Sequence, residues 1–263
     1  MGHYYTDDPP AAFYEIEYAD KTRAGEYRPV SIKDARREGA YPSPNTIMGI
    51  MDKPGLMYWK MQMLGEATRD TVLDLGGDWD EYAQSQAYNL YKERTEIFSK
   101  QGTEIHDMIE QCLISDGTYE PDLIVDACVD WLHEEKIEWT GVEEIFVSPE
   151  VGIGGKIDVV DATSSGHPLS NVGTIVDWKT IDTVSKKFRP YTKDKTPLLA
   201  AYAMGRFGTL EVDLWNVFIS RDEPGKIIPK LYTPEEIEFG WQKFELCYYL
   251  WVLDKGYDPR KEM

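Results

Sequence analysis

The apolar residues of this 263-residue chain change their spacing near residue 140. Before that point they recur every three or four residues, as Leu56, Trp59 and Met63 do, which is typical of amphipathic helices. After it the period shortens to two, as in 142–148, which is typical of strands. The chain is therefore predicted to belong to the α+β class, with a helical N-terminal part followed by a sheet.

The helical pattern fills the first half of the chain. Helices are expected at 31–39, 46–52, 55–75, 79–114 and 121–136. Ser43 or Asn45 is a suitable N-cap for the second of these helices, and Pro121 suits the first turn of the last. Gly102 marks a kink or a helix start within the expected helix at 79–114. Residues 1–30 are expected to form an irregular arm with one short strand.

The second half of the chain is predicted to hold the sheet. Strands are expected at 142–148, 154–161, 172–180, 213–220 and 226–232. The first three should be antiparallel, since the turn-rich segment 163–171 joins two of them as a hairpin, and a helix at 196–208 precedes the fourth. Thr233 should cap a final helix, with Glu236 at the capping-box position. The expected fold is a central mixed sheet flanked by helices.

Residues 1–263 are expected to form a single domain, which is an ordinary length for one core. Its parts would be an N-terminal arm (1–40), a helical part (41–137), the sheet core (138–232) and a C-terminal helix (233–263).

Composition excludes several classes of protein. There is no run of 18 apolar residues and no signal-peptide pattern, so we expect a cytoplasmic protein without a membrane segment. Cys112, Cys128 and Cys247 lie in apolar helical patterns and are expected to be core thiols, too scattered for an iron–sulfur cluster. The chain has no Walker-type phosphate loop, so no nucleotide cofactor is expected.

The net charge of −19 counts against nucleic-acid binding, because phosphate contacts normally need a basic surface. A metal-dependent site must collect carboxylates, however, and the field that matters is local to a channel. Cations gather in 186–195, where Lys186, Lys187 and Arg189 can follow a DNA backbone or serve as solvated loop charges.

Two predicted strands carry acidic residues that are costly to bury unless they bind a metal or a cationic partner. Asp177 and Lys179 are two residues apart and share a face of one strand. If the strand with Asp158 pairs with it, two carboxylates and an ammonium group form a site for Mg²⁺ or Mn²⁺. The cation would activate a water for phosphodiester hydrolysis, with the Trp178 carbonyl as a further ligand and Lys179 offsetting charge. An Asp-x-Lys tripeptide alone is more often an exposed ion pair.

Four motifs follow one another along 42–205. They are Pro42-Ser43-Pro44-Asn45-Thr46-Ile47-Met48 with Leu56 and Trp59, Gly102-Thr103-Glu104-Ile105-His106, Gly155-Lys156-Ile157-Asp158 with Asp177-Trp178-Lys179-Thr180, and Thr196-Pro197-Leu198-Leu199-Ala200-Ala201-Tyr202. In this order they resemble the RecB-like branch of the PD-(D/E)xK nuclease superfamily, including mitochondrial genome maintenance exonucleases and phage exonucleases. The resemblance implies a restriction-endonuclease-like core.

The resemblance also implies an enzyme that acts on DNA ends, single-stranded or linear, with Mg²⁺ or Mn²⁺. Its metal ligands would be His106, Asp158 and Asp177, and its catalytic lysine would be Lys179. A lone histidine on a helix is often structural, so His106 remains open between the two roles.

The resemblance also implies three accessory positions. Glu110 follows the histidine motif, Glu143 aligns with an acidic position, and Tyr202 is the tyrosine of the family's Gln-x-x-x-Tyr helix. Glu144 and Glu150 compete with Glu143 for the acidic position that precedes the Gly-x-x-Asp strand. Leu198 stands where the family has a glutamine that helps to position the lysine or the DNA. We therefore expect a lower rate or a weaker hold on the substrate, with the metal site retained.

Three residues of the helical part are candidates for DNA contact, and each has a structural alternative. Trp59 can stack on bases in a single-strand channel or lie in the core. Ser43 and Thr46, near a helix start, can bind a phosphate or act as a plain N-cap.

The leading hypothesis is an exonuclease in DNA processing, recombination or repair, with a phage origin and with recombination or replication proteins as partners. An endonuclease of the same superfamily would use the same metal site and would also cut circular single strands. An inactive scaffold that binds DNA or protein is the third hypothesis, favoured by Leu198 and by the net charge. The oligomeric state stays open, since the final helix suits either the core or a second copy.

Overall fold

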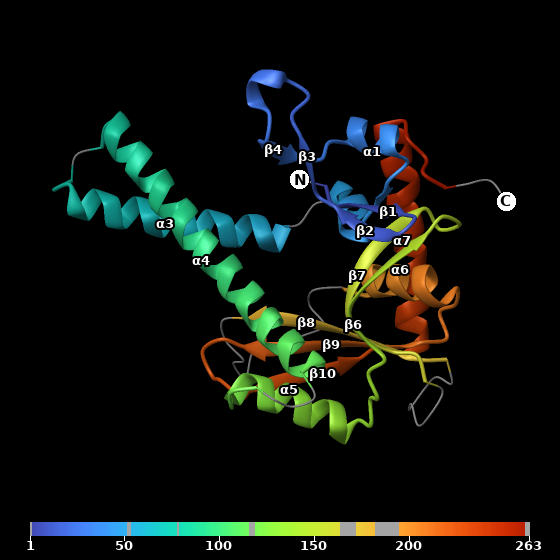
Figure 1. Cartoon of the computed structure of the whole chain (residues 1–263). Helices are drawn as coiled ribbons and strands as arrows, with labels where there is room; N and C mark the ends of the chain where they lie inside the picture. The colour runs from blue at the N-terminus through green and yellow to red at the C-terminus, as the bar shows by residue number, and fades with distance from the viewer. Residues whose placement is uncertain are drawn as a thin grey trace. The chain divides into compact units, whose positions relative to one another are not determined.

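The computed structural model describes residues 2–51, 54–77, 79–115, 119–163, 172–181 and 195–260. Lys186, Lys187 and Arg189, the predicted backbone contacts, lie outside these ranges. The chain divides into a larger unit of residues 1–50 and 109–263 and a smaller unit of residues 51–108. Figure 1 labels the elements of both.

The larger unit is built on a five-stranded mixed sheet in the order β10-β9-β8-β7-β6 (Figure 1). Its strands are β6 (Gly141–Ser148), β7 (Ile153–Asp161), β8 (Thr174–Ile181), β9 (Asp213–Ser220) and β10 (Ile227–Leu231). β6, β7 and β8 are antiparallel neighbours, β8 runs parallel to β9, and β9 is antiparallel to β10. The predicted α+β fold with a mixed sheet and three antiparallel strands is confirmed.

The parallel pairing of β8 with β9 needs a crossover, and α6 (Thr196–Phe207) lies between them in sequence. Its first eight residues are all buried, because α6 packs against the sheet and against α7 (Pro234–Lys255). Gly240 of α7 allows a close approach, since a Cβ at this position would lie 2.7 Å from the carbonyl carbon of Thr196. Thr233 and Glu236 form the predicted capping box of α7.

Helix α5 (Leu123–Glu134) packs on β8 and β9 through tryptophan rings. Trp131 meets Trp178 edge-on at 5.9 Å and Trp215 at 5.2 Å between ring centroids. Pro121 precedes this helix and is not in its first turn, so that expectation is wrong. The Asp122 carboxylate accepts hydrogen bonds from the amides of Ile124 and Val125 at 2.8 and 3.2 Å. Asp122 is therefore the N-cap, and the helix begins at Leu123.

The N-terminal segment is more regular than the expected irregular arm. β1 (Tyr4–Asp7), β2 (Pro10–Phe13) and β5 (Tyr41–Pro42) form one antiparallel sheet, and β3 (Glu15–Glu17) pairs with β4 (Tyr27–Pro29). These strands are short and β1 pairs with residues far away in sequence, so they leave little local pattern. The N-terminal sheet packs against β6 and β7.

Short helices connect these strands to the rest of the larger unit. They are a 3₁₀ turn (Lys21–Arg23), α1 (Ile32–Glu38), α2 (Pro44–Ile47) and a second 3₁₀ turn (Met48–Ile50). Ser43 caps α2, as one of the two expected N-caps, but the helix is shorter than predicted and continues as 3₁₀.

The smaller unit consists of α3 (Pro54–Asp74) and most of α4 (Glu81–Ile114). An ion pair of 2.8 Å joins Asp70 to Arg94, and Trp59 meets Phe98 edge-on at 5.9 Å. Gly102 lies inside α4 and is not a helix start.

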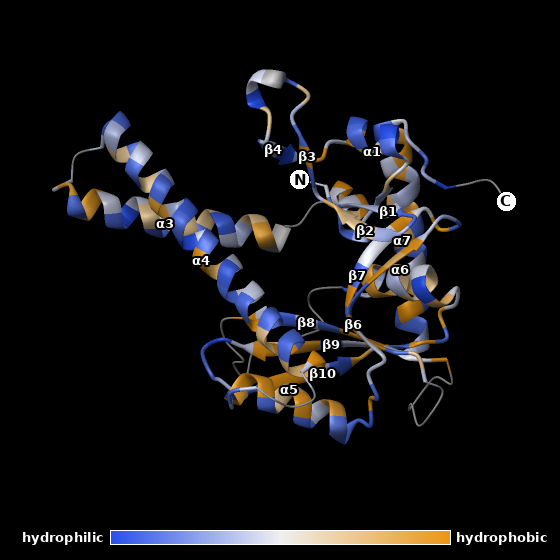
Figure 2. Cartoon of the chain, viewed as in Figure 1, coloured by the Kyte–Doolittle hydropathy of each residue, from blue (hydrophilic) through white to orange (hydrophobic). Residues whose placement is uncertain are grey.

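Burial follows the apolar pattern of the chain. Figure 2 shows apolar residues gathered in the five-stranded sheet, whereas α4 is mostly hydrophilic. The three cysteines are buried, as predicted. Within the described ranges, no helix combines the length and the apolar composition that crossing a bilayer requires.

The contact between α6 and α7 gives a test of this packing. Gly240→Ala should lower the free energy of unfolding of the larger unit by roughly 1–3 kcal/mol, because the new methyl group meets backbone. The matched control is Gly65→Ala in α3, where a Cβ meets nothing within 4 Å and a gain of about 0.5 kcal/mol is expected. Urea denaturation followed by circular dichroism measures both. A Gly240→Ala protein as stable as the wild type would contradict the packing.

Candidate functional site

A row of polar side chains crosses four neighbouring strands at one level of the sheet. In β6 and β7, Val142 pairs with Val159 and Glu144 with Ile157, so Glu143 lies at the level of Asp158 although these two residues are not themselves paired. Continued by one residue, the register of β7 with β8 puts Asp158 opposite Asp177, and Asp177 pairs with Asn216 of β9. The predicted pairing of the two aspartate-bearing strands thus brings three carboxylates and one amide to one place.

Asp158 stands where the backbone pairing of β7 with β8 stops. The last paired residues are Val159 and Val176. At the next step the amide of Trp178 donates to Asp158 Oδ2 at 2.8 Å. A side-chain carboxylate therefore satisfies an amide that a carbonyl of the neighbouring strand would otherwise satisfy.

Glu143 is held in an uncommon backbone conformation. Its φ is +50°, in the left-handed region, which costs a non-glycine residue on the order of 1–3 kcal/mol. Its carboxylate forms an ion pair with Lys156 of β7. Glu144 pairs with Arg206 of α6, and Glu150 lies in the turn after β6. Of the three acidic candidates, Glu143 is the one that faces Asp158.

Asp177 is oriented by donors on two sides. The Lys179 ammonium group lies 2.5 Å from Asp177 Oδ2 and donates to the Trp178 carbonyl at 3.1 Å. Asn216 Nδ2 donates to the same Oδ2 at 2.6 Å and to the Asp177 carbonyl at 3.2 Å. The Tyr232 hydroxyl in turn donates to Asn216 Oδ1 at 2.9 Å. The carboxylate has little freedom to rotate.

Asn216 and Tyr232 were not among the predicted site residues. Asn216 is fully buried and lies in the strand Asp213–Ser220, where every residue is buried. A buried amide between apolar neighbours is costly unless it is hydrogen-bonded. An asparagine inside an apolar strand was therefore the sequence feature that could have pointed to Asn216. Its partner Asp177 is 39 residues away and could not be read from spacing.

Three carboxylates share the site with the ammonium groups of Lys156 and Lys179. Burial, followed by the charge of Asp177, raises the pKa of Asp158 to about 8. Burial alone would lower the pKa of Lys179, but the charges of Asp177 and Asp158 outweigh it and raise that pKa. Burial and the same two carboxylates also raise the pKa of Tyr202. Lys179 therefore stays protonated, and the raised pKa of Asp158 shows that its surroundings disfavour a further negative charge.

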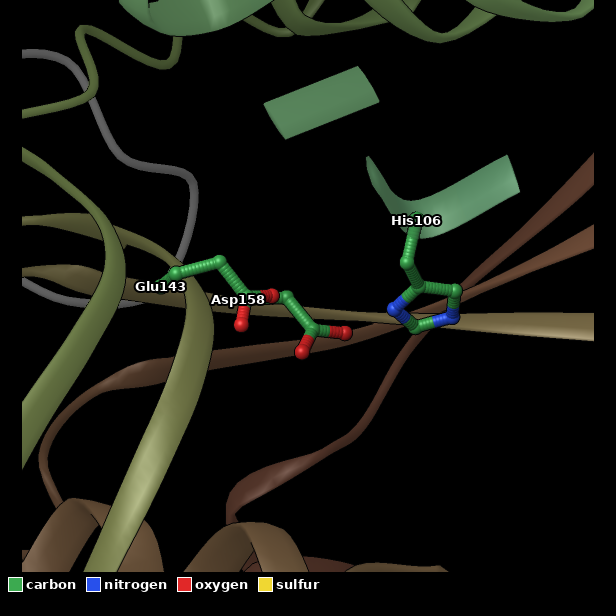
Figure 3. Close-up of side chains that lie close together, drawn as sticks. All are labelled: His106, Glu143 and Asp158. Atoms are coloured by element: carbon green, nitrogen blue, oxygen red, sulfur yellow. The ribbon is translucent and has the colours of Figure 1, made fainter. Parts of the chain in front are cut away.

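His106 lies on α4 in the smaller unit, whereas Glu143 and Asp158 belong to the larger unit. Figure 3 labels these three side chains, of which Glu143 and Asp158 supply the carboxylates of a candidate metal group. Two carboxylates and an imidazole can hold a divalent metal ion. Asp177 is outside this group in the described residues, and its carboxylate is held by Lys179 and Asn216.

The accessory positions lie around this group. Glu110 follows His106 by one turn of α4 and its charge acts on Lys156. Tyr202 is buried and meets Phe146 edge-on at 5.8 Å. Leu198 is buried in the apolar core of the larger unit.

The predicted DNA contacts lie elsewhere in the two units. Trp59 is half-buried in the smaller unit. In the larger unit, Ser43 Oγ and Thr46 Oγ1 are hydrogen-bonded to each other at 2.9 Å, and the Thr46 hydroxyl also accepts from the His3 amide. These hydroxyls stabilise the start of α2, as expected if Ser43 and Thr46 act as a plain N-cap. Their contact with DNA remains a prediction.

Comparison with known proteins adds little. No family model and no curated protein matches the chain. A solved structure from Eubacterium rectale, provisionally described as an exonuclease, is similar with a TM-score of 0.31 and 16% identity, over 71% of this chain and 68% of that chain. A TM-score this low supports no conclusion about fold or activity, so the site is interpreted from its own side chains.

The crowded carboxylates give a test that is independent of activity. In metal-free protein, Asp158→Asn should raise the free energy of unfolding by about 1–4 kcal/mol at pH 8, because it removes a buried charge and keeps an acceptor for Trp178. The pKa of Asp158 is raised, so wild type should lose stability relative to the variant as pH rises from about 4, the unfolded value, to about 8.

Adding Mn²⁺ should reverse this order, since a cation that binds the folded state stabilises it. Thermal melts at pH 5 and pH 8, with Mn²⁺ or with EDTA, measure both effects. Equal stability of the two proteins at pH 8 in EDTA would show that Asp158 is not under electrostatic strain.

Proposed function

We propose that this protein is a divalent-metal-dependent DNA exonuclease of the PD-(D/E)xK type, which hydrolyses phosphodiester bonds from the ends of single-stranded or linear DNA. The observation that carries the proposal is the row of Glu143, Asp158 and Asp177 on adjacent strands, with the Lys179 ammonium group beside it. This is the arrangement that metal-assisted phosphodiester hydrolysis needs.

The donor set fits a hard divalent cation. Carboxylate oxygens suit Mg²⁺ and Mn²⁺, and an imidazole ligand is more usual for transition metals, which favours Mn²⁺ if His106 binds. Glu143 and Asp158 of the larger unit would hold the ion, with Asp177, the Trp178 carbonyl and the sequence-predicted His106 as further proposed ligands. The bound ion would polarise the scissile phosphate and lower the pKa of a water.

Lys179 is the proposed catalytic cation. Asp177 and the Trp178 carbonyl fix its ammonium group, and it stays charged because both aspartates favour the protonated form. A fixed ammonium group can orient the attacking water or offset the negative charge that grows on the phosphate. No reorganisation is needed at the moment of reaction, since the network is already in place.

Leu198 does not argue for an inactive scaffold on its own. An amide already contacts Asp177 in this chain, and it belongs to Asn216. A dead site would have no use for three crowded carboxylates, because they lower stability when no cation is bound. A role in DNA processing, recombination or repair, in the cytoplasm of a host cell, remains part of the proposal.

A cleavage assay tests the reaction. We expect wild type to degrade end-labelled linear DNA with Mg²⁺ or Mn²⁺, to fail with EDTA, and to leave closed circular single strands intact. Cutting of the circle would indicate an endonuclease, and no cleavage with either metal would contradict a nuclease. The position of the label among the products gives the polarity.

Two variants separate chemistry from metal binding. Asp177→Ala should abolish cleavage, and Lys179→Ala should lower the rate at least about a hundredfold while Mn²⁺ binding by calorimetry is kept. The matched control is Lys226→Ala, which removes an exposed lysine paired with Glu223 and should cleave like wild type. Full activity of Lys179→Ala would remove the lysine from the mechanism.

Removing the hydrogen-bond donors that hold Asp177 should lower activity by a smaller factor than removing Asp177 or Lys179. Asn216→Ala removes the amide bond to the carboxylate, and we expect a loss of about ten- to a hundredfold in kcat or in metal affinity. Tyr232→Phe removes only the hydroxyl that holds Asn216 and should give a smaller loss in the same parameter. An effect of Tyr232→Phe on stability alone would show that the network is merely structural.

A further inference from the structure

Two aromatic rings lie next to each other at the edge of the N-terminal sheet. The ring centroids of His3 and Tyr14 are 4.7 Å apart, with an angle of 37° between the planes. His3 is exposed and Tyr14 is half-buried, so the pair presents ring surface to solvent. We call these two residues the aromatic platform.

Hydrogen bonds hold the side chain of Tyr14 and the backbone of His3. The Tyr14 hydroxyl shares a hydrogen bond of 2.7 Å with that of Tyr5, whose ring packs edge-on at 5.7 Å. The His3 amide donates to Thr46 Oγ1 at 2.8 Å, and its carbonyl accepts from the Ser43 amide at 2.8 Å. A surface that is ordered before binding loses little entropy when a ligand stacks on it.

The platform is joined to the strand that carries Asp158. Tyr5 packs so closely on Gly154 of β7 that a Cβ there would lie 2.5 Å from Tyr5 Cβ. Gly154, Lys156 and Asp158 alternate along β7 and share one face. That face therefore presents a contact with Tyr5, which supports the platform through Tyr14, an ammonium group on a side chain that is 44% exposed, and a candidate metal ligand. The three positions span about 13 Å.

We infer that this face of β7 is a subsite for one unpaired nucleotide, whose base stacks on His3 and Tyr14 and whose phosphate contacts Lys156. The inference rests on the proposed nuclease function and deepens it, because it makes a single strand or a frayed end the substrate.

The chemistry of the subsite restricts what it binds. Every base has a π-face, so the platform accepts any sequence, whereas paired bases inside a duplex are stacked on each other and cannot reach it. Lys156 supplies a cation for the phosphate in a chain whose net charge of −19 would otherwise repel DNA.

The test compares two labelled single-stranded oligonucleotides of equal length, one with all its bases and one with abasic sites at its end. Binding is measured by fluorescence anisotropy with the full chain carrying Lys179→Ala, in Mn²⁺, so that the probe stays intact. We expect the complete oligonucleotide to bind about tenfold more tightly, because stacking is lost with the base. Adding Tyr14→Leu or His3→Ala should bring the ratio of the two affinities close to one.

The matched control is Tyr27→Leu, which removes a tyrosine on β4 that is 62% exposed and should leave the ratio unchanged. Melting temperatures show that the variants fold. Equal binding of the two probes, or a ratio that survives Tyr14→Leu and His3→Ala, would overturn the subsite.

Cleavage by wild type separates the two proposals. Cleavage of linear DNA without a difference between the probes would leave the nuclease and remove the subsite. A difference in affinity between the two probes without any cleavage would leave the subsite and remove the nuclease. Absence of cleavage together with absence of binding to either probe would remove both.

Discussion

The sheet and the site depend on one hydrogen bond, at the step where β7 and β8 stop pairing through their backbones. The Trp178 amide donates there to the Asp158 carboxylate, so a side chain completes the ladder. The bond holds Asp158 between Glu143 and Asp177 and buries its charge among theirs. The contact that extends the pairing of β7 with β8 therefore also holds Asp158 in the electrostatic repulsion that a bound cation would relieve.

The features that could be predicted from the sequence are those with a local signal. Asp177 and Lys179 share a face because a strand alternates, and Thr233 with Glu236 marks a helix start by spacing alone. The N-terminal strands have no such signal, because they are two to four residues long and Tyr4 pairs with Pro42, far along the chain. The pairing partners of short strands are decided by tertiary packing.

The neighbours of the site could not be predicted for a related reason. Asn216 reaches Asp177 only because β9 lies parallel to β8 in one particular register, which no spacing in the sequence reveals. Glu143 and Glu144 are adjacent, and a backbone with a φ of +50° decides which of them faces Asp158. The motif residues were found because they lie close together in sequence, whereas their supporting residues come from other strands.

The left-handed backbone of Glu143 has a consequence for how such a chain can change over generations. Glycine adopts this conformation without strain, so Glu143→Gly would relax the backbone and remove one of the crowded carboxylates in a single change. Selection for stability alone would favour that replacement. The proposed binding of a cation would supply the selection that keeps an acidic side chain at this position, and a descendant that no longer needs the site should lose Glu143 early.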